Sequence, residues 1–224
     1  MRKICLEPDY LGCKFEINLA NGMHQGGGQL FIQKFLSDPD IRALLTPTNT
    51  IMEMCCGYGG MGYYLANKFN LEKAIFIDID PEVEEGIESN KSLVNFDTEF
   101  YLSSAFKSYY GSKVDLIVLN PPHITTEEEY LRCQENSPEY FPIEYDKRSR
   151  LILLDEDFKF HTDFCRDVSN FLTDKGQIVF FENEVFIPHQ RIKDLLGTEY
   201  TYKFIQNRKL DEPEYYMLIA QKIH

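Results

Sequence analysis

Short apolar runs alternate with stretches of helical periodicity along most of the chain. The apolar runs cover residues 50–55, 74–80, 98–103, 114–119 and, as I-V-F-F-E, 178–182. Between them, apolar residues recur at helical spacing, and Pro81 opens a helix over 81–94 whose acidic first turn suits the helix dipole. This alternation predicts an α/β fold with a doubly wound, mostly parallel sheet that binds ligands at the carboxyl ends of its strands.

Three details of the pattern make specific predictions. The runs at 98–103 and 114–119 are apolar enough to be buried on both faces of a sheet. The stretch 155–172 predicts one helix, with helical spacing of Phe158, Phe164, Val168, Phe171 and Leu172. The runs at 200–206 and 215–223 flank N-R-K-L-D-E-P, which predicts an antiparallel hairpin at the edge of the sheet.

About fifty residues precede the first predicted strand. We expect residues 1–48 to form an extension that packs on the core and residues 49–224 to form the main domain. Within the extension, N-G-M-H-Q-G-G-G-Q-L at 21–30 is either a surface loop or a mobile cover that brings His24 or Gln25 to a substrate.

Composition favours a soluble, cytoplasmic protein. The chain has 224 residues, of which 43% are hydrophobic, as expected of one globular domain. Acidic and polar residues interrupt the first twenty positions, and no apolar run is long enough to span a bilayer. The six cysteines show no C-x-x-C spacing, so we expect reduced thiols and assign no metal.

The net charge of −13 repels phosphate backbones and makes a nucleic-acid partner less favoured. A small basic contact is still open, and its candidates are Lys147, Arg148, Arg150, Arg208 and Lys209.

Three segments at predicted strand ends carry candidate chemistry. E-M-C-C-G-Y-G-G-M-G at 53–62 leaves a strand and enters a helix, so backbone N–H groups and a helix N-terminus can approach a ligand there. Asp78 follows about 20 residues later, the distance at which an acidic residue meets ribose hydroxyls in dinucleotide folds. An ordinary strand-to-helix turn is the alternative reading of the glycines.

The third segment is V-L-N-P-P-H-I at 118–124, directly after a predicted buried strand. Asn-Pro-Pro is also common in ordinary loops, and His123 could be a surface histidine. The strand-end position favours a catalytic role. Residues 125–150 would then select the substrate, whereas Glu127 to Glu129 predict a solvated helix start.

In order along the chain, E-M-C-C-G-Y-G-G, F-I-D-I-D-P and V-D-L-I-V-L-N-P-P-H resemble the signatures of class I S-adenosylmethionine-dependent methyltransferases. The match runs from about Thr50 to Ile187, and the resemblance implies a seven-stranded sheet. N-P-P followed by an aromatic residue or histidine resembles the branch that methylates planar nitrogens. Residues 155–182 look similar to the glutamine-modifying release-factor methyltransferases.

The resemblance implies a cofactor site and a catalytic corner. Glu53 and the turn Cys55, Cys56, Gly57, Tyr58 and Gly59 would surround the methionine part of the cofactor, and Asp78 its ribose. Ile79 would cover the adenine, and Ser104 and Asn120 would complete the site. Cys55 stands where the family usually has glycine, and Ser104 where it often has an acid.

The corner suits methyl transfer, in which the protein mainly aligns a nitrogen lone pair with the methyl carbon. The Asn120 side-chain oxygen and the Pro121 carbonyl would accept the two hydrogens of the target nitrogen. Pro121 and Pro122 fix this backbone. His123 would either lie against the flat substrate group or accept a proton.

We therefore expect an S-adenosylmethionine-dependent N-methyltransferase, with a glutamine side chain of a protein as the leading acceptor. Small-molecule methylation, adenine or guanine methylation in RNA or DNA, and a non-catalytic binding protein on the same fold are the alternatives. The expected partner is a protein or small-molecule acceptor, with no membrane, and the oligomeric state is left open.

Overall fold

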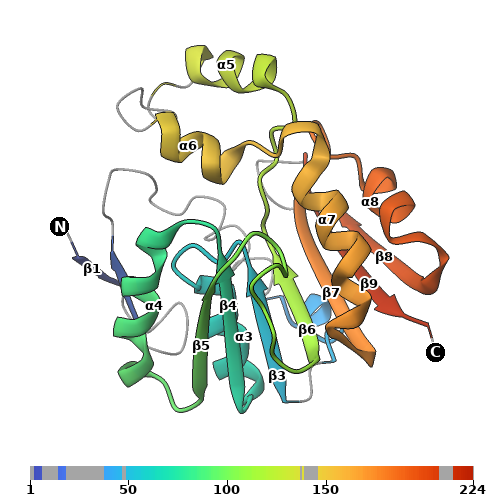
Figure 1. The fold of residues 1–224 in the computed structure, drawn as a ribbon. Coiled ribbons are helices and arrows are strands. Elements are labelled where there is room, and N and C mark those ends of the chain that lie inside the picture. Colours follow the sequence, from blue (N-terminus) through green and yellow to red (C-terminus); the bar gives the residue numbers. More distant parts are fainter. Residues whose placement is uncertain are drawn as a thin grey trace.

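A computed structural model describes residues 3–6, 15–18, 38–46, 49–136, 138, 146–206 and 214–223. The possible cover at 21–30 and the basic residues Arg208 and Lys209 lie outside the described residues. Of the N-terminal extension, two short strands are described, β1 (Lys3–Leu6) and β2 (Phe15–Asn18), which pair antiparallel. They lie beside α4 (Glu84–Asn90) in Figure 1.

A seven-stranded sheet forms the centre of the molecule (Figure 1). Its order is β5-β4-β3-β6-β7-β9-β8, and β9 runs antiparallel to both of its neighbours. The prediction of a mostly parallel, doubly wound sheet that ends in an antiparallel hairpin is confirmed. The strands are β3 (Thr50–Met54), β4 (Lys73–Asp78), β5 (Asp97–Leu102), β6 (Val114–Leu119), β7 (Leu172–Asn183), β8 (Tyr200–Gln206) and β9 (Tyr215–Lys222).

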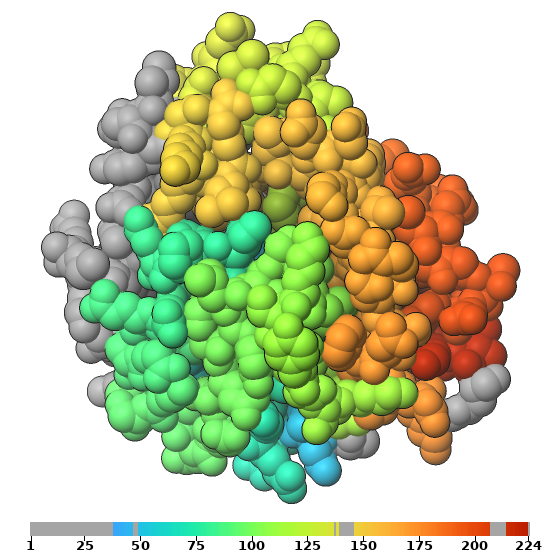
Figure 2. Space-filling view, in the orientation of Figure 1, coloured from blue at the N-terminus to red at the C-terminus, as the bar shows by residue number. Residues whose placement is uncertain are grey.

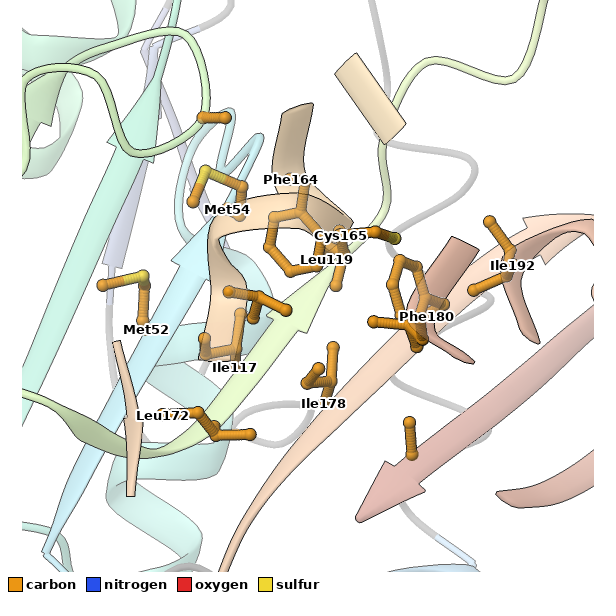
Figure 3. Packing of buried hydrophobic residues seen from close by; sticks show 14 of the residues in the cluster. Met52, Met54, Ile117, Leu119, Phe164, Cys165, Leu172, Ile178, Phe180 and Ile192 are labelled. Atoms are coloured by element: carbon orange, nitrogen blue, oxygen red, sulfur yellow. The ribbon is translucent and has the colours of Figure 1, made fainter. Parts of the chain in front are cut away.

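Helices cover both faces of the sheet because each carries an apolar stripe. One buried cluster joins the sheet to α3 and α4, and the other joins it to α7 and α8 (Figure 3). The further helices are α2 (Pro39–Arg42), α3 (Gly60–Phe69), α5 (Glu127–Asn136), α6 (Asp146–Leu153), α7 (Lys159–Asp167) and α8 (His189–Leu196). Short 3₁₀ turns occupy Pro81–Val83, Lys91–Leu93, Glu156–Phe158, Val168–Asn170 and Gly197–Glu199.

The runs at 98–103 and 114–119 were both predicted to be buried on two faces of the sheet. This prediction is right for β6 and wrong for β5. All but one of the β6 residues are buried, whereas β5 is partly exposed along its length and Leu102 is 48% exposed. The reason is topological, because β5 is the outermost strand of the sheet order.

The prediction of one helix over 155–172 is also wrong in detail. Asp157 and Phe158 have positive φ values of 57° and 58°, so α7 starts only at Lys159. At the other end, Leu172 already pairs with Val114 and belongs to β7. Pairing with β6 therefore makes Leu172 part of a strand, although the spacing of its apolar neighbours alone predicts a helix.

The direction in which successive strands are added to the sheet reverses between β3 and β6. From β3 the chain proceeds outward to β4 and β5 and then returns to the other side of β3 as β6. In such sheets, ligands bind at the carboxyl ends of the strands beside this reversal. The helices α5 and α6 lie above that end of the sheet in Figure 1. Among the described residues, no helix is long and apolar enough to cross a membrane.

Candidate active site

Three neighbouring strands end at one level at the candidate site. Met54 of β3 is in register with Ile77 of β4 and with Leu119 of β6. Because the strands are parallel, the residues that follow leave the sheet side by side. The fold thus brings together the three segments that the sequence singled out, at Cys55, Asp78 and Asn120.

The glycine turn between β3 and α3 requires its glycines. Gly57 and Gly59 have φ values of 51° and 80°, in the left-handed region that side chains disfavour. A Cβ atom at Gly59 would lie 2.8 Å from both Ile87 Cδ1 and Tyr63 Cε2. The turn therefore packs closely against neighbouring side chains and carries the chain straight into the first turn of α3.

Cys55 shares this left-handed conformation without being glycine. Its φ is 54°, and it occupies the position where glycine was expected from the resemblance. An L-residue pays an energetic cost in this conformation, so the turn stores strain at its first residue. Burial, then the negative charge of Asp78, raises the pKa of the Cys55 thiol, which keeps it neutral.

Glu53 lies beneath the turn and is fully buried. Its Oε2 accepts a 2.6 Å hydrogen bond from the backbone N–H of Gly62 in α3. Its other oxygen, Oε1, is buried and has no partner among the described residues. Burial raises the pKa of Glu53 to about 8, against the lowering effect of the Gly62 and Met61 amides. A buried acceptor therefore remains open to a donor at this turn.

Asp78 ties the glycine turn to β4. Its Oδ2 accepts from the Gly57 N–H at 2.8 Å, and its Oδ1 accepts from the Asp80 N–H at 2.9 Å. Burial raises the pKa of this carboxyl, and the two amides partly offset that rise. A carboxylate has about four lone-pair sites, so both oxygens retain capacity for hydroxyl donors.

The other residues predicted to bind the cofactor lie in the glycine turn or directly after the ends of β4 and β5. Cys56 is buried, and its N–H donates to the Ile77 carbonyl at 3.1 Å. Tyr58 is half-buried, and burial, then the charge of Glu53, raises the pKa of its phenol. Ile79 is 42% exposed. Ser104 follows Ser103, whose N–H donates to the Asp78 carbonyl at 2.8 Å.

The Asn-Pro-Pro-His corner begins directly after β6. Asn120 is half-buried, and no residue in the described part of the chain hydrogen-bonds to its side chain. Pro121 is buried and Pro122 is half-buried. The exit from the corner is fixed because Ile124 donates to the Leu153 carbonyl at 3.1 Å and accepts from the Asp155 N–H at 2.7 Å.

A buried line of ionisable residues, which the sequence did not predict, starts at the corner. His123 Nδ1 lies 2.8 Å from Glu182 Oε2, and the other Glu182 oxygen lies 2.7 Å from His161 Nε2. His161 Nδ1 is in turn 2.6 Å from Asp155 Oδ2. We call His123, Glu182, His161 and Asp155 the buried relay. Three of its members are buried, and His123 keeps 18% of its side-chain surface exposed.

His161, in the middle of the relay, is charged at neutral pH. Burial alone lowers the pKa of His161, but the charge of Glu182 and the hydrogen bonds that the ring donates to both carboxylates outweigh it and raise that pKa to about 9. A buried imidazolium between two carboxylates is the paired arrangement that a protein interior tolerates.

One signal for the relay was available in the sequence. Glu182 ends an apolar strand, as Asp78 does, and an acid at that position is costly to bury without a partner. The identity of the partner was not available, because His161 stands within an aromatic run that reads as ordinary core.

The sequence predicts Arg148 of α6 as a candidate for a small basic contact with nucleic acid, and the structure instead pairs it with two acidic side chains. Its guanidinium binds Asp80 through Nε at 2.8 Å and through Nη2 at 2.7 Å, and binds Glu82 through Nη1 at 2.9 Å. The yellow atoms of α6 meet the teal segment after β4 in Figure 2. The contact fastens α6 over the strand end that carries Asp78.

Comparison with known proteins gives a family. The model of the methyltransferase small domain matches residues 23–136. Among curated proteins no match was found.

Solved structures with the same fold are similar over most of this chain. A methyltransferase from Pyrococcus furiosus is 16% identical with a TM-score of 0.62, covering 96% of this chain and 91% of that one. A 16S rRNA N2 methyltransferase from Thermus thermophilus, in complex with AdoMet and guanosine, is 15% identical with a TM-score of 0.60, covering 99% and 50%. A ribosomal protein L11 methylase from Lactobacillus delbrueckii is 18% identical with a TM-score of 0.54, covering 82% and 74%.

At these identities the solved structures show the fold, and the family model carries the assignment. The matched residues 23–136 make up just over half of the 224 residues and include the glycine turn, Asp78 and the Asn-Pro-Pro-His corner. This chain therefore belongs to the methyltransferase small domain family.

Proposed function

We propose that this methyltransferase uses S-adenosylmethionine and that its acceptor is a planar nitrogen held by the Asn-Pro-Pro-His corner. The observation that carries the proposal is the level arrangement of three strand ends, which sets Asn120 beside the glycine turn. The half-buried Asn120 side chain has no hydrogen-bond partner in the described part of the chain. Its oxygen can therefore accept a hydrogen bond from an N–H of the molecule that is methylated.

The residues at the glycine turn suit this cofactor. When ionised, Glu53 can accept through its open Oε1 from an ammonium group, whose positive charge opposes the raised pKa of this carboxyl, and the N-terminus of α3 can face a carboxylate. Asp78 retains acceptor capacity for ribose hydroxyls. Bound S-adenosylmethionine supplies an electrophilic methyl group on a sulfonium. The chain's own task is to position the acceptor and exclude misaligned approaches.

At the corner, Asn120 and the Pro121 carbonyl hold the acceptor nitrogen. Two acceptors on its two hydrogens draw the nitrogen out of conjugation and aim its lone pair. The proline rings fix the backbone dihedrals, so the Pro121 carbonyl keeps one direction through the reaction. This preorganisation is the main catalytic contribution of the protein.

The leading acceptor is the side-chain amide of a protein glutamine. The net charge of −13 opposes an RNA or DNA substrate and is compatible with a protein or a small molecule. An amino group of a base in RNA is the second candidate. This second candidate is supported by the solved rRNA methyltransferase in complex with AdoMet and guanosine, which aligns over 99% of this chain.

Incubation with methyl-labelled S-adenosylmethionine and separated protein, RNA and metabolite pools tests the proposal. We expect label in the protein pool, on glutamine after proteolytic digestion and as methylamine after acid hydrolysis. Calorimetry with the cofactor and its demethylated product provides the control. Folded protein that binds neither compound would overturn the enzymatic reading.

A further inference from the structure

The buried relay extends from the corner into the core through three side chains that the proposed mechanism does not use. Glu182, on β7, holds His123 with one carboxylate oxygen and His161 with the other. Asp155, which follows α6, holds the far nitrogen of His161. Each contact is 2.8 Å or shorter, and the three inner side chains have at most 3% of their surface exposed.

We propose that Glu182 is a positioning residue that orients His123 as a proton acceptor, and that His161 and Asp155 keep Glu182 in place as a hydrogen-bond acceptor toward His123. The inference rests on the proposed function, because it assigns the proton that a methylated nitrogen must lose. The sequence leaves two roles open for His123, lying against the substrate and accepting a proton. The inference assigns it the role of proton acceptor.

The proton positions follow from the geometry. Both ring nitrogens of His161 face carboxylate oxygens, at 2.6 and 2.7 Å. Ionised carboxylates only accept, so each nitrogen must carry a proton and the ring is an imidazolium. The pKa of His161, raised to about 9 by Glu182 and Asp155 against the effect of burial, agrees with this count.

Glu182 is thereby left as an acceptor toward His123. Its Oε2 lies 2.8 Å from His123 Nδ1, so neutral His123 carries its proton on Nδ1. The lone pair of the ring is then on Nε2, which has no hydrogen-bond partner among the described residues. Fixing the tautomer through the opposite nitrogen is the role that the carboxylate plays in a nucleophile–histidine–carboxylate triad.

The neighbouring titratable groups do not compete for this proton. Burial, then the charge of Glu182, raises the pKa of the Cys165 thiol and of the Tyr216 phenol, so both stay neutral. Burial and then Asp78 do the same for Cys55. Tyr215 and His123 form a T-shaped pair with ring centroids 5.9 Å apart, so Tyr215 does not stack in parallel on the imidazole.

The step balances without a further reactant. The acceptor nitrogen forms a bond to the methyl carbon while the carbon–sulfur bond breaks, and the sulfur keeps that electron pair. The methylated nitrogen is then positively charged, and one of its two protons leaves its hydrogen bond to Asn120 or to the Pro121 carbonyl and passes to His123 Nε2. Because His123 is 18% exposed, it can return the proton to water while the inner relay stays unchanged.

The first test is nitrogen NMR of the wild-type protein labelled at histidine. We expect neutral His123 with Nδ1 protonated and Nε2 bare, and His161 protonated on both nitrogens at pH 7. His189 is an internal reference, since its Nδ1 lies 2.8 Å from Glu184 in a separate pair. A proton on Nε2 of neutral His123, or a neutral His161 at pH 7, would overturn the inference.

This measurement needs no methyl acceptor, so it separates the inference from the proposed function. If the tautomer is as expected and no planar nitrogen is methylated, the proposed function fails and the orientation of His123 stands. If methylation occurs and the tautomer is reversed, the orientation fails and the function stands.

The second test is the rate of label transfer from S-adenosylmethionine to the pool that the wild type labels. Glu182→Gln presents an amide to Nδ1 and should reverse the tautomer, lowering the rate about 100-fold with cofactor affinity unchanged. His123→Phe should lose as much, and the double variant no more. Glu184→Gln, in the matched pair, should keep the wild-type rate. Full activity in His123→Phe would overturn proton acceptance, whether or not Glu182→Gln folds.

Discussion

Cys55 enters the glycine turn with a φ of 54°, a backbone conformation that costs an L-residue roughly 1–2 kcal/mol. Its position between Glu53 and Gly57 means that this strain lies within the proposed cofactor site. The strain arises from the Cβ atom, and removing that atom should release it. Single substitutions at this residue can therefore separate backbone strain from the chemistry of the thiol.

We predict that Cys55→Gly is more stable than Cys55→Ala by about 1 kcal/mol, because alanine keeps the Cβ atom and glycine does not. Both variants lack the thiol, so its packing cancels in the comparison. Urea denaturation of both proteins measures the difference. Equal midpoints and equal slopes would show that the turn is not strained at this residue.

Glu53 should make stability depend on pH. The pKa of its carboxyl is 4.5 when the side chain is exposed in the unfolded chain and about 8 in the folded chain. Between these values the folded state keeps a proton that the unfolded state has lost, so rising pH favours unfolding. The contribution is fully present below pH 4.5 and disappears as pH rises through about 8.

We predict that Glu53→Gln removes this dependence, since the amide does not titrate. The free energy of unfolding of wild type minus that of the variant should fall steadily from pH 5 to pH 8. Comparing the two proteins cancels the separate titration of His161, which the variant retains. A difference that stays constant across this range would contradict a buried, protonated Glu53.

At the scale of elements, α5 and α6 form a segment between β6 and α7 that described contacts link to the ends of β4 and β6. Arg148 joins α6 to Asp80 and Glu82 at the end of β4, and Ile124 joins the corner to the end of α6. Inside the segment, Arg150 binds Asp146 of α6 and Glu127 of α5. The first contact holds α6 to the sheet, and the last holds α5 and α6 together.

We predict that Arg148→Met speeds amide hydrogen exchange in α6 and raises the rate of cofactor release, because α6 loses its attachment to β4. Methionine keeps the apolar stem and removes the charge. The matched variant Arg150→Met should loosen α5 from α6 and leave cofactor release unchanged. Identical release rates in wild type and Arg148→Met would show that α6 does not cover the cofactor.

Much of this element plan could be predicted from the sequence, because local patterns set it. The apolar run at 114–119 predicts β6, and the glycines after Glu53 predict the turn before α3. Pro81 predicts the start of the helical segment that leads into α4. Relations between distant segments were not predictable. The early start of β7 depends on pairing of Leu172 with Val114, and the relay joins residues 59 positions apart in His123 and Glu182.

At the scale of the whole molecule, the charge of −13 limits the partners that can approach. Its long-range field repels phosphate and slows encounter with nucleic acid. Local basic groups in the described part do little to reverse this, since Arg148 and Arg150 are engaged with carboxylates.

We predict that labelling of the acceptor pool survives nuclease treatment of the extract. Affinity for bulk RNA should be negligible at physiological salt, because few phosphates can be neutralised. Fluorescence anisotropy with labelled RNA over a range of salt measures the second point. Tight binding with a steep salt dependence would favour the amino group of an RNA base as the acceptor.

The central claim is that Asn120, beside the glycine turn, holds the nitrogen that is methylated, and the rate of Asn120→Ala tests it most directly. With the acceptor that the wild type labels, single-turnover methyl transfer should fall by about two orders of magnitude while calorimetric cofactor affinity stays the same. Thermal unfolding establishes that the variant is folded. A folded Asn120→Ala protein that binds the cofactor and transfers methyl groups at the wild-type rate would contradict the account.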